Sequence, residues 1–230
     1  MSLLIDRREV LRWMGRASAG AAALHLVGAC GGGGDAGGDG DLALDAPPAP
    51  PLDGRGCRVT TADVLGPYHR DGAPSRMMIA SATEPGERLV LDGVVVADDC
   101  TTPLVGAMLD VWQADRHGTY YEPDAAGSEP FRLRGKLAAA ADGTWAVDTI
   151  RPGNYQQGPG LWRPAHVHVI VSHPGYRSVT TQLYFAGDPY LPPNDSCTTC
   201  GSDDPDRILA LTPGIAGGWH GEVRIVLQRA

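Results

Sequence analysis

Two histidines separated by a single residue, His166 and His168, are the side chains whose types and spacing most directly indicate chemistry. They alternate with a set of apolar residues, which are Ala165, Val167, Val169 and Val171. Side chains two positions apart on a β-strand point to the same face, so a strand here places both imidazoles together, opposite the apolar side chains. Imidazole is the commonest metal ligand, so the pair could form part of a metal site. The alternative is that both histidines are polar residues on a solvated face.

Phenol side chains in two upstream segments give a second indication. Tyr155 precedes the histidines in a Gly/Pro-rich loop, and Tyr120 and Tyr121 stand side by side further upstream. A hard trivalent ion can deprotonate a phenol whose free pKa is about 10, and tyrosinate is an iron ligand in haem proteins. Two phenols and two imidazoles therefore suit ferric iron, although any one of these tyrosines alone is more often a structural aromatic.

The composition is that of an ordinary globular protein. The chain has 230 residues, a formal net charge of −8 and 43% hydrophobic residues. This length and apolar content predict a single domain that can bury a sizeable core. The mild acidic balance gives no electrostatic reason to expect a nucleic-acid partner.

Residues 1–30 are typical of an export signal. Arg7 and Arg8 resemble a twin-arginine signal, and the weakly apolar run over 17–29 is too short for a membrane span. The run ends in L-V-G-A-C, which resembles a bacterial lipobox. We therefore expect acylation of Cys30 and an exported, periplasmic or cell-surface protein tethered to a membrane by its lipid. The alternative is cleavage at another position, with Cys30 incidental.

Residues 31–56 predict a flexible linker, because this Gly/Ala/Pro-rich stretch can bury little apolar area. Four cysteines follow, and an even number in an exported domain predicts two disulfides with three connectivities. We favour Cys57 with Cys100, and Cys197 with Cys200. The C-x-x-C spacing is also found in redox motifs and zinc sites, but there is no second C-x-x-C and no surrounding βα pattern.

The pattern from residue 57 to residue 230 predicts an all-β domain. Residues 89–96 form a near-continuous apolar run, typical of a strand covered on both faces. Further alternating runs predict strands over 107–112, 131–137, 145–147, 165–171, 179–185 and 223–227. Gly/Pro turn signals separate these runs, and residues 206–211 alone suggest a short helical turn. Many short strands of this kind favour a two-sheet β-sandwich.

Several motifs resemble the intradiol ring-cleavage dioxygenase family, in that family's order. They read G-P-Y, L-V-G-A-M-L-D-V-W-Q-A-D with G-T-Y, R-P-G-N-Y with W-R-P-A-H-V-H, and T-T-Q-L-Y-F, at 66–68, 104–120, 151–168 and 180–185. The sequence W-Q-A at 112–114 is closer to the protocatechuate 3,4-dioxygenase branch than to the catechol branch. The resemblance covers most of 57–230 and implies the two-sheet sandwich of this family.

Carried over position by position, the resemblance implies four ligands of Fe(III), namely Tyr120, Tyr155, His166 and His168. The G-x-Y spacing selects Tyr120 and not Tyr121. It also implies a substrate pocket, lined by Pro67, Tyr68 and Arg163.

The activity implied is cleavage of a catechol-type ring by O₂ between its two hydroxylated carbons, giving a cis,cis-muconate-type diacid. The iron would act as Lewis acid and template. Tyr155 would leave the iron and accept a substrate proton, while Arg163 would stabilise the developing negative charge. Gln182 would orient Arg163 or the bound intermediate.

The sequence departs from the family at Gln156-Gln157, where we expect a proline and an aromatic residue, so the ring preference stays open. No helical dimerisation segment precedes Cys57, and we expect a monomer or a homo-oligomer. One alternative function is a catalytically inactive, surface-tethered β-sandwich that binds an aromatic or a glycan. A zinc hydrolase built on His166 and His168 lacks an obvious third ligand at useful spacing.

Overall fold

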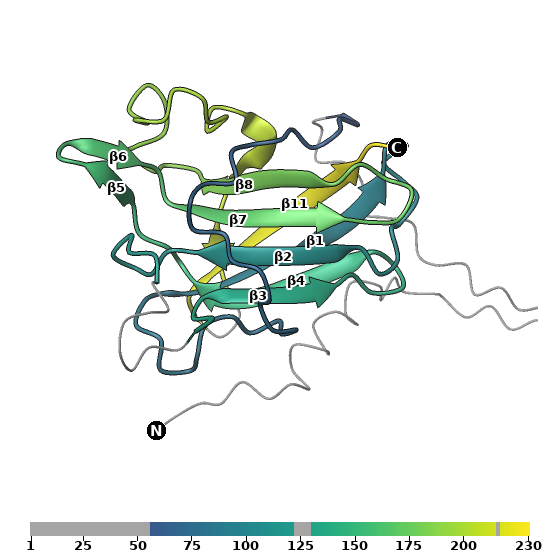
Figure 1. Ribbon diagram of the computed structural model, residues 1–230, viewed down its shortest axis with the longest axis horizontal. Coiled ribbons are helices and arrows are strands. Elements are labelled where there is room, and N and C mark those ends of the chain that lie inside the picture. The colour runs from purple at the N-terminus through teal and green to yellow at the C-terminus, as the bar shows by residue number, and fades with distance from the viewer. Residues whose placement is uncertain (1–55, 122–129, 215–216) are drawn as a thin grey trace, which may run out of the picture. The chain divides into compact units, whose positions relative to one another are not determined.

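Two β-sheets and a separate hairpin make up the computed structural model, which describes residues 56–121, 130–214 and 217–230 (Figure 1). One sheet has the order β10-β11-β1-β4, with strands Thr212–Pro213, Trp219–Leu227, Arg88–Ala97 and Thr144–Ile150. The other has the order β3-β2-β7-β8-β9, with strands Arg134–Ala138, Met108–Gln113, His166–Ser172, Val179–Phe185 and Ile208–Leu209. The signal peptide predicted over 1–30 and the linker predicted up to residue 56 lie outside the described residues, apart from Gly56.

The facing sides of the two sheets share one apolar core. Alternate residues of the strands in both sheets are almost fully buried in it, among them Leu89, Leu91, Leu109, Val111, Val147, Val167, Val169, Leu183 and Ile225. Burying a side chain of this size contributes about 1.5–3 kcal/mol. The predicted two-sheet sandwich is confirmed, and Figure 1 shows the five-stranded sheet in front of β1 and β11.

Strand β1 explains the near-continuous apolar run at 89–96. It pairs antiparallel with β4 on one side and parallel with β11 on the other. Its inward side chains join the shared core, and its outward Val94 and Val96 pack with Cys100 and Val226 in a second apolar cluster. The strand is therefore covered on both faces at Val94 and Val96, whereas the outward side chains of Val90 and Asp92 are only half-buried, so the prediction holds for the second half of the strand.

The strand predicted from Phe131 is shorter than expected, because β3 begins only at Arg134. Leu133 has a φ of 55°, which interrupts the extended backbone that the alternation indicates. Arg134 is buried instead of solvated, and its Nη1 donates a hydrogen bond to the carbonyl oxygen of Tyr68 at 2.6 Å. This contact ties the segment around Tyr68 to the sheet.

The loop expected around Tyr155 is instead a two-stranded hairpin. Strands β5 (Tyr155–Gly158) and β6 (Leu161–Arg163) pair antiparallel, with Tyr155 opposite Arg163. The turn falls at Pro159-Gly160, where Gly160 has a φ of 75° that favours glycine. The hairpin projects beyond one end of the five-stranded sheet (Figure 1) and carries two of the predicted site residues.

Both favoured disulfides, Cys57–Cys100 and Cys197–Cys200, are present. The helical turn suggested for 206–211 is a single 3₁₀ turn, η1 (Pro205–Arg207), whose N-cap Asp204 accepts a hydrogen bond from the Asp206 backbone N–H. Strand β9 starts directly afterwards, so the rest of that segment is not helical. Within the described residues, no helix has the length and apolar character needed to span a membrane.

Candidate functional site

The two histidines lie side by side on β7, the central strand of the five-stranded sheet. His168 is opposite Trp112 of β2 and Gln182 of β8, and both imidazoles are only 3% exposed. The indole of Trp112 stacks on the His168 ring with centroids 4.6 Å apart. The alternative of two polar residues on a solvated face is therefore wrong.

Tyr120 meets both histidines. Its hydroxyl oxygen lies 2.9 Å from Nε2 of His166 and 2.9 Å from Nε2 of His168. The turn leading to it requires Gly118, which has a φ of 75° and where a Cβ would stand 1.8 Å from the Asn154 carbonyl oxygen. This close approach places the Tyr120 segment directly against the start of the hairpin.

A carbonyl group fixes the tautomer of His166. Its Nδ1 lies 2.7 Å from the Pro164 carbonyl oxygen, and because a carbonyl only accepts, the proton is assigned to Nδ1. Nε2 then presents a lone pair toward the Tyr120 hydroxyl. Nδ1 of His168 is buried and has no hydrogen-bond partner among the described residues.

Burial keeps both imidazoles neutral. It lowers the pKa of His166 to about 4, and it lowers the pKa of His168 well below its usual value; the positive charge of Arg163 acts in the same direction on both. Neutral imidazole is the form that binds a metal. Burial also raises the pKa of the Tyr120 phenol, and the nearby Arg163 charge only partly opposes this.

Tyr155 stands beside this group but has a different partner. Its hydroxyl oxygen is 2.9 Å from that of Tyr68, and its ring meets the Tyr120 ring edge-on at 5.5 Å. Burial raises the pKa of Tyr155 to about 12, and the hydrogen bond to Tyr68 acts in the same direction. Tyr68 also stacks on Tyr120 with centroids 4.2 Å apart, so it contacts both phenols, while its neighbour Pro67 is exposed.

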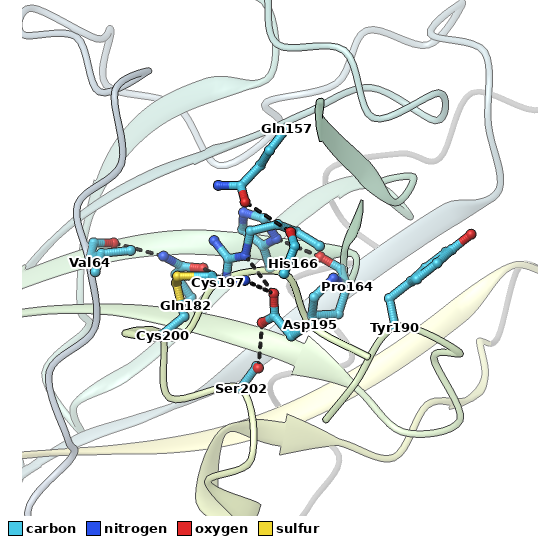
Figure 2. A network of polar contacts seen from close by, with 12 residues as sticks. Val64, Gln157, Pro164, His166, Gln182, Tyr190, Asp195, Cys197, Cys200 and Ser202 are labelled. Atoms are coloured by element: carbon cyan, nitrogen blue, oxygen red, sulfur yellow. Dashed lines mark hydrogen bonds and ion pairs between the residues drawn. A yellow bond between two sulfur atoms is a disulfide. The ribbon is translucent and has the colours of Figure 1, made fainter. Parts of the chain in front are cut away.

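Arg163 is held by three side chains at the base of the hairpin. Its Nε donates to Asp195 at 3.2 Å, and its Nη2 donates to Gln182 and to Tyr184, each at 3.1 Å. Gln182 in turn donates through Nε2 to the Val64 carbonyl oxygen at 2.7 Å (Figure 2). The predicted contact between Gln182 and Arg163 is therefore present.

Two further acidic residues position the site and were missed by sequence reasoning. Asp188 accepts hydrogen bonds from the Asn154 side chain and from the Ala165 backbone N–H, so it ties together the residues preceding Tyr155 and His166. Asp195 holds Arg163 from 32 residues away. Each lies in a loop after β8, and neither spacing nor periodicity signals such a role.

The donor set suits ferric iron. The Tyr120 hydroxyl oxygen and both imidazole Nε2 atoms converge on one place, and a cation there can accept a lone pair from each of the three atoms. Among the described residues, no group of three or more His, Cys, Asp or Glu side chains could hold a metal. A metal at this place would therefore draw on the phenols as well as the histidines, and a hard trivalent ion is the one that phenolate oxygen fits.

Comparison with known proteins relates the chain to dioxygenases. The family model described as "Dioxygenase" matches residues 64–211. The chain is 36% identical over 163 residues to a chlorocatechol 1,2-dioxygenase of Rhodococcus opacus, covering 63% of this chain and 63% of that protein. It is 32% identical over 198 residues to a chlorocatechol 1,2-dioxygenase of Pseudomonas sp. strain P51, covering 78% and 74%. The chain thus spans somewhat less than two thirds of the Rhodococcus relative.

A solved structure with the same architecture is the dioxygenase domain of a dioxygenase carbohydrate-binding protein fusion from Streptomyces sp. SirexAA-E. It has a TM-score of 0.62 and 35% sequence identity, and the match covers 75% of this chain and all of that one. The protocatechuate-like wording at Trp112-Gln113-Ala114 is not tested by these relatives and stays a prediction.

Proposed function

This chain belongs to the intradiol ring-cleavage dioxygenase family, and we propose that it cleaves a catechol-type aromatic ring between its two hydroxylated carbons, consuming O₂. The product would be a cis,cis-muconate-type diacid. The observation that carries the proposal is the meeting of the Tyr120 hydroxyl with both histidine Nε2 atoms at 2.9 Å, in a buried site beside a second phenol.

Fe(III) would be held by Tyr120, Tyr155, His166 and His168. Bound there, it would supply a Lewis acid and one-electron partner that makes the electron-rich ring reactive toward O₂. The two neutral imidazoles and the buried phenol of Tyr120 form the rigid part of this set, because all three belong to the packed five-stranded sheet or its adjoining turn.

Of the two phenols, Tyr155 is the one that its surroundings hold less tightly, and it is therefore the one that would leave the iron. It is only half-buried, it lies on the hairpin, and its hydroxyl already has a hydrogen-bond partner in Tyr68. As a phenolate it would accept a proton from a substrate hydroxyl, and the Tyr68 hydroxyl would stay hydrogen-bonded to it during the transfer. Pro67 and Tyr68 would form one wall for the substrate.

Arg163 would stabilise negative charge that develops on the substrate oxygens. Its positive charge acts on the pKa values of Tyr120, Tyr155 and His166, which supports this electrostatic role. A fixed cation in a buried site costs no reorganisation at the moment of reaction. Gln182 and Tyr184 keep its Nη2 occupied.

The test is oxygen uptake and product absorbance with the iron-loaded protein, using a panel of catechol, protocatechuate and hydroxyquinol. Turnover of at least one substrate, with one O₂ consumed per ring opened, is the expected result. A protein that binds these compounds and takes up iron but consumes no O₂ would instead be the inactive binding module. Arg163→Ala and Arg177→Ala form a matched pair, because Arg163 is buried in the site and Arg177 is exposed. Comparing their oxygen uptake separates the loss of the site arginine from the loss of a surface arginine.

We further propose export with a lipid tether at Cys30, based on the twin-arginine and lipobox resemblances in residues 1–30. The protein should fractionate with membranes and carry an acyl mass on its N-terminal peptide. Replacing Cys30 by Ser should release it into the soluble fraction; unchanged membrane association would contradict the tether.

A further inference from the structure

A short loop closed by the Cys197–Cys200 disulfide lies against the hairpin that carries Tyr155 and Arg163. The loop, residues 194–202, follows β8 and contains Asp195, whose side chain is 2% exposed. Figure 2 shows Asp195 beside Cys197, with Ser202 on its other side. A carboxylate this deeply buried is retained only with good partners.

Both carboxylate oxygens of Asp195 accept hydrogen bonds. Its Oδ1 accepts from the Arg163 Nε at 3.2 Å and from the Cys197 backbone N–H at 2.9 Å. Its Oδ2 accepts from the Ser202 hydroxyl at 2.5 Å. Two of these three donors come from the 194–202 loop, one from the disulfide residue Cys197 and one from Ser202 just beyond Cys200, so the loop sets the direction in which the carboxylate faces the guanidinium.

Ser196, in the same loop, forms hydrogen bonds with the hairpin. The Ser196 backbone N–H donates to the Trp162 carbonyl oxygen on β6, and its hydroxyl donates to the Gln157 side chain on β5, each at 2.9 Å. Both strands of the hairpin are thus fastened to the loop. Gln157, where the family resemblance leads us to expect an aromatic residue, is one of the anchors.

We propose that Asp195 is a positioning residue for Arg163, and that the Cys197–Cys200 loop is the device that keeps Asp195 in place; this rests on the ring-cleavage function proposed above. A guanidinium is a planar fork, so fixing it at Nε and at Nη2 sets its plane and the direction of Nη1. No hydrogen bond joins Nη1 to any residue that the structure describes, which leaves this nitrogen to face the substrate.

Loss of Asp195 would leave Arg163 held at Nη2 alone. The guanidinium could then tilt about Nη2, which Gln182 and Tyr184 still hold, and the direction of Nη1 would no longer be fixed. Opening the disulfide would have a milder effect of the same kind, because residues 197–200 would gain conformations and the Cys197 N–H would no longer be fixed on Asp195. The iron donors do not contact this loop through any described hydrogen bond, so iron binding should be spared.

The experiment compares full-length, iron-loaded variants: Asp195→Ala, Asp195→Asn, and the double variant Cys197→Ser/Cys200→Ser. The matched control is Cys57→Ser/Cys100→Ser, which opens the disulfide on the other sheet. We expect kcat to fall about 10- to 100-fold in Asp195→Ala, as for other orienting contacts, with iron content and visible spectrum unchanged. Asn keeps an acceptor at Oδ1, so Asp195→Asn should recover most of that loss, and the control should keep wild-type kcat.

A second readout does not depend on turnover. Reaction of Arg163 with phenylglyoxal, followed by mass spectrometry of its peptide, should be slow in the wild type and in the control, and faster in Asp195→Ala and in the Cys197/Cys200 variant. If the wild type has iron but opens no ring, the proposed function fails while this readout still tests the positioning. Wild-type kcat and labelling in Asp195→Ala would overturn the inference, as would loss of iron or colour in that variant. An Asn variant as impaired as the Ala variant would overturn it too, because charge and not position would then be responsible.

Discussion

Removal of one disulfide should mainly lower stability, and removal of the other should mainly lower activity. Cys57–Cys100 links residues 43 apart in sequence, whereas Cys197–Cys200 links residues only 3 apart. In the chain-entropy model a cross-link stabilises by restricting the unfolded chain, and the effect grows with the logarithm of the loop length. Replacing the first pair by serines should therefore lower the free energy of unfolding by about 4 kcal/mol, and replacing the second by only about 1.5 kcal/mol.

The structure supports this order. Cys100 is buried in the apolar cluster with Val94, Val96 and Val226, so serine there also leaves a polar hydroxyl in an apolar site. A loss of about 4 kcal/mol is a large fraction of the 5–15 kcal/mol typical of a domain. The Cys197–Cys200 loop instead adjoins the Asp195–Arg163 contact, so its loss should appear in kcat.

The assay is urea unfolding followed by tryptophan fluorescence, because Trp112 and Trp145 are both buried. The Cys57/Cys100 variant should shift the midpoint strongly and keep kcat at 25 °C; the Cys197/Cys200 variant should shift it little and lower kcat. The reasoning is refuted if the short-loop variant is the less stable of the two, or if the long-loop variant is the one that loses kcat.

Three further predictions concern the core and the histidines. Leu109→Ala, which truncates a fully buried side chain, should lower the free energy of unfolding by about 2–5 kcal/mol, whereas Leu161→Ala on the exposed hairpin should change it by less than about 0.5 kcal/mol; equal losses in urea titrations would contradict the burial. In iron-free protein the unfolded chain protonates His166 near pH 6.5, whereas burial lowers the pKa of His166 in the folded chain to about 4. The contribution of His166 to the free energy of unfolding should therefore be full above pH 6.5 and fall by up to about 3 kcal/mol toward pH 4. Unfolding titrations at several pH values should show a decline, and His166→Gln should make it smaller but not remove it, because burial lowers the pKa of His168 as well. Gly66→Ala should lower iron affinity measured by chelator competition, because its φ of 71° is strained for alanine and the new Cβ would stand 3.3 Å from His168 Cε1; Gly175→Ala, also at positive φ but in open space, should not.

Much of the sheet that holds the site could be predicted from sequence, because its signals are local. The strict alternation from Ala165 to Val171 sets which face is buried in the core, and it puts His166 and His168 together on the other. The run at 89–96 likewise predicts a strand covered on both faces, which β1 is at Val94 and Val96. Such patterns depend only on the two-residue repeat of a strand.

The parts that could not be predicted depend on contacts between distant segments. The parallel pairing of β1 with β11 joins two ends of the domain, and no local pattern selects that partner. Leu133 at positive φ is a strained position for a branched side chain, so alternation alone extends the strand through it. Asp188 and Asp195 lie in irregular loops, where a carboxylate that orients another side chain has the same sequence appearance as a solvated one.

Gly118 shows an intermediate case. A glycine two residues before a tyrosine marks a turn, but the reason for it is the backbone of Asn154, with which any Cβ at position 118 would collide. The turn is predictable from the residue type, and the close approach is visible only in three dimensions. That approach is what brings Tyr120 and Tyr155 into the same site.

The central claim is that Tyr120, with Tyr155, His166 and His168, holds ferric iron. It is tested most directly by the visible absorption spectrum and iron content of the loaded wild type, Tyr120→Phe and its neighbour control Tyr121→Phe. We predict a phenolate-to-iron charge-transfer band with about one iron per chain in the wild type and in Tyr121→Phe, and loss of most of the band in Tyr120→Phe. A colourless wild type after iron loading, or an unchanged band in Tyr120→Phe, would contradict it.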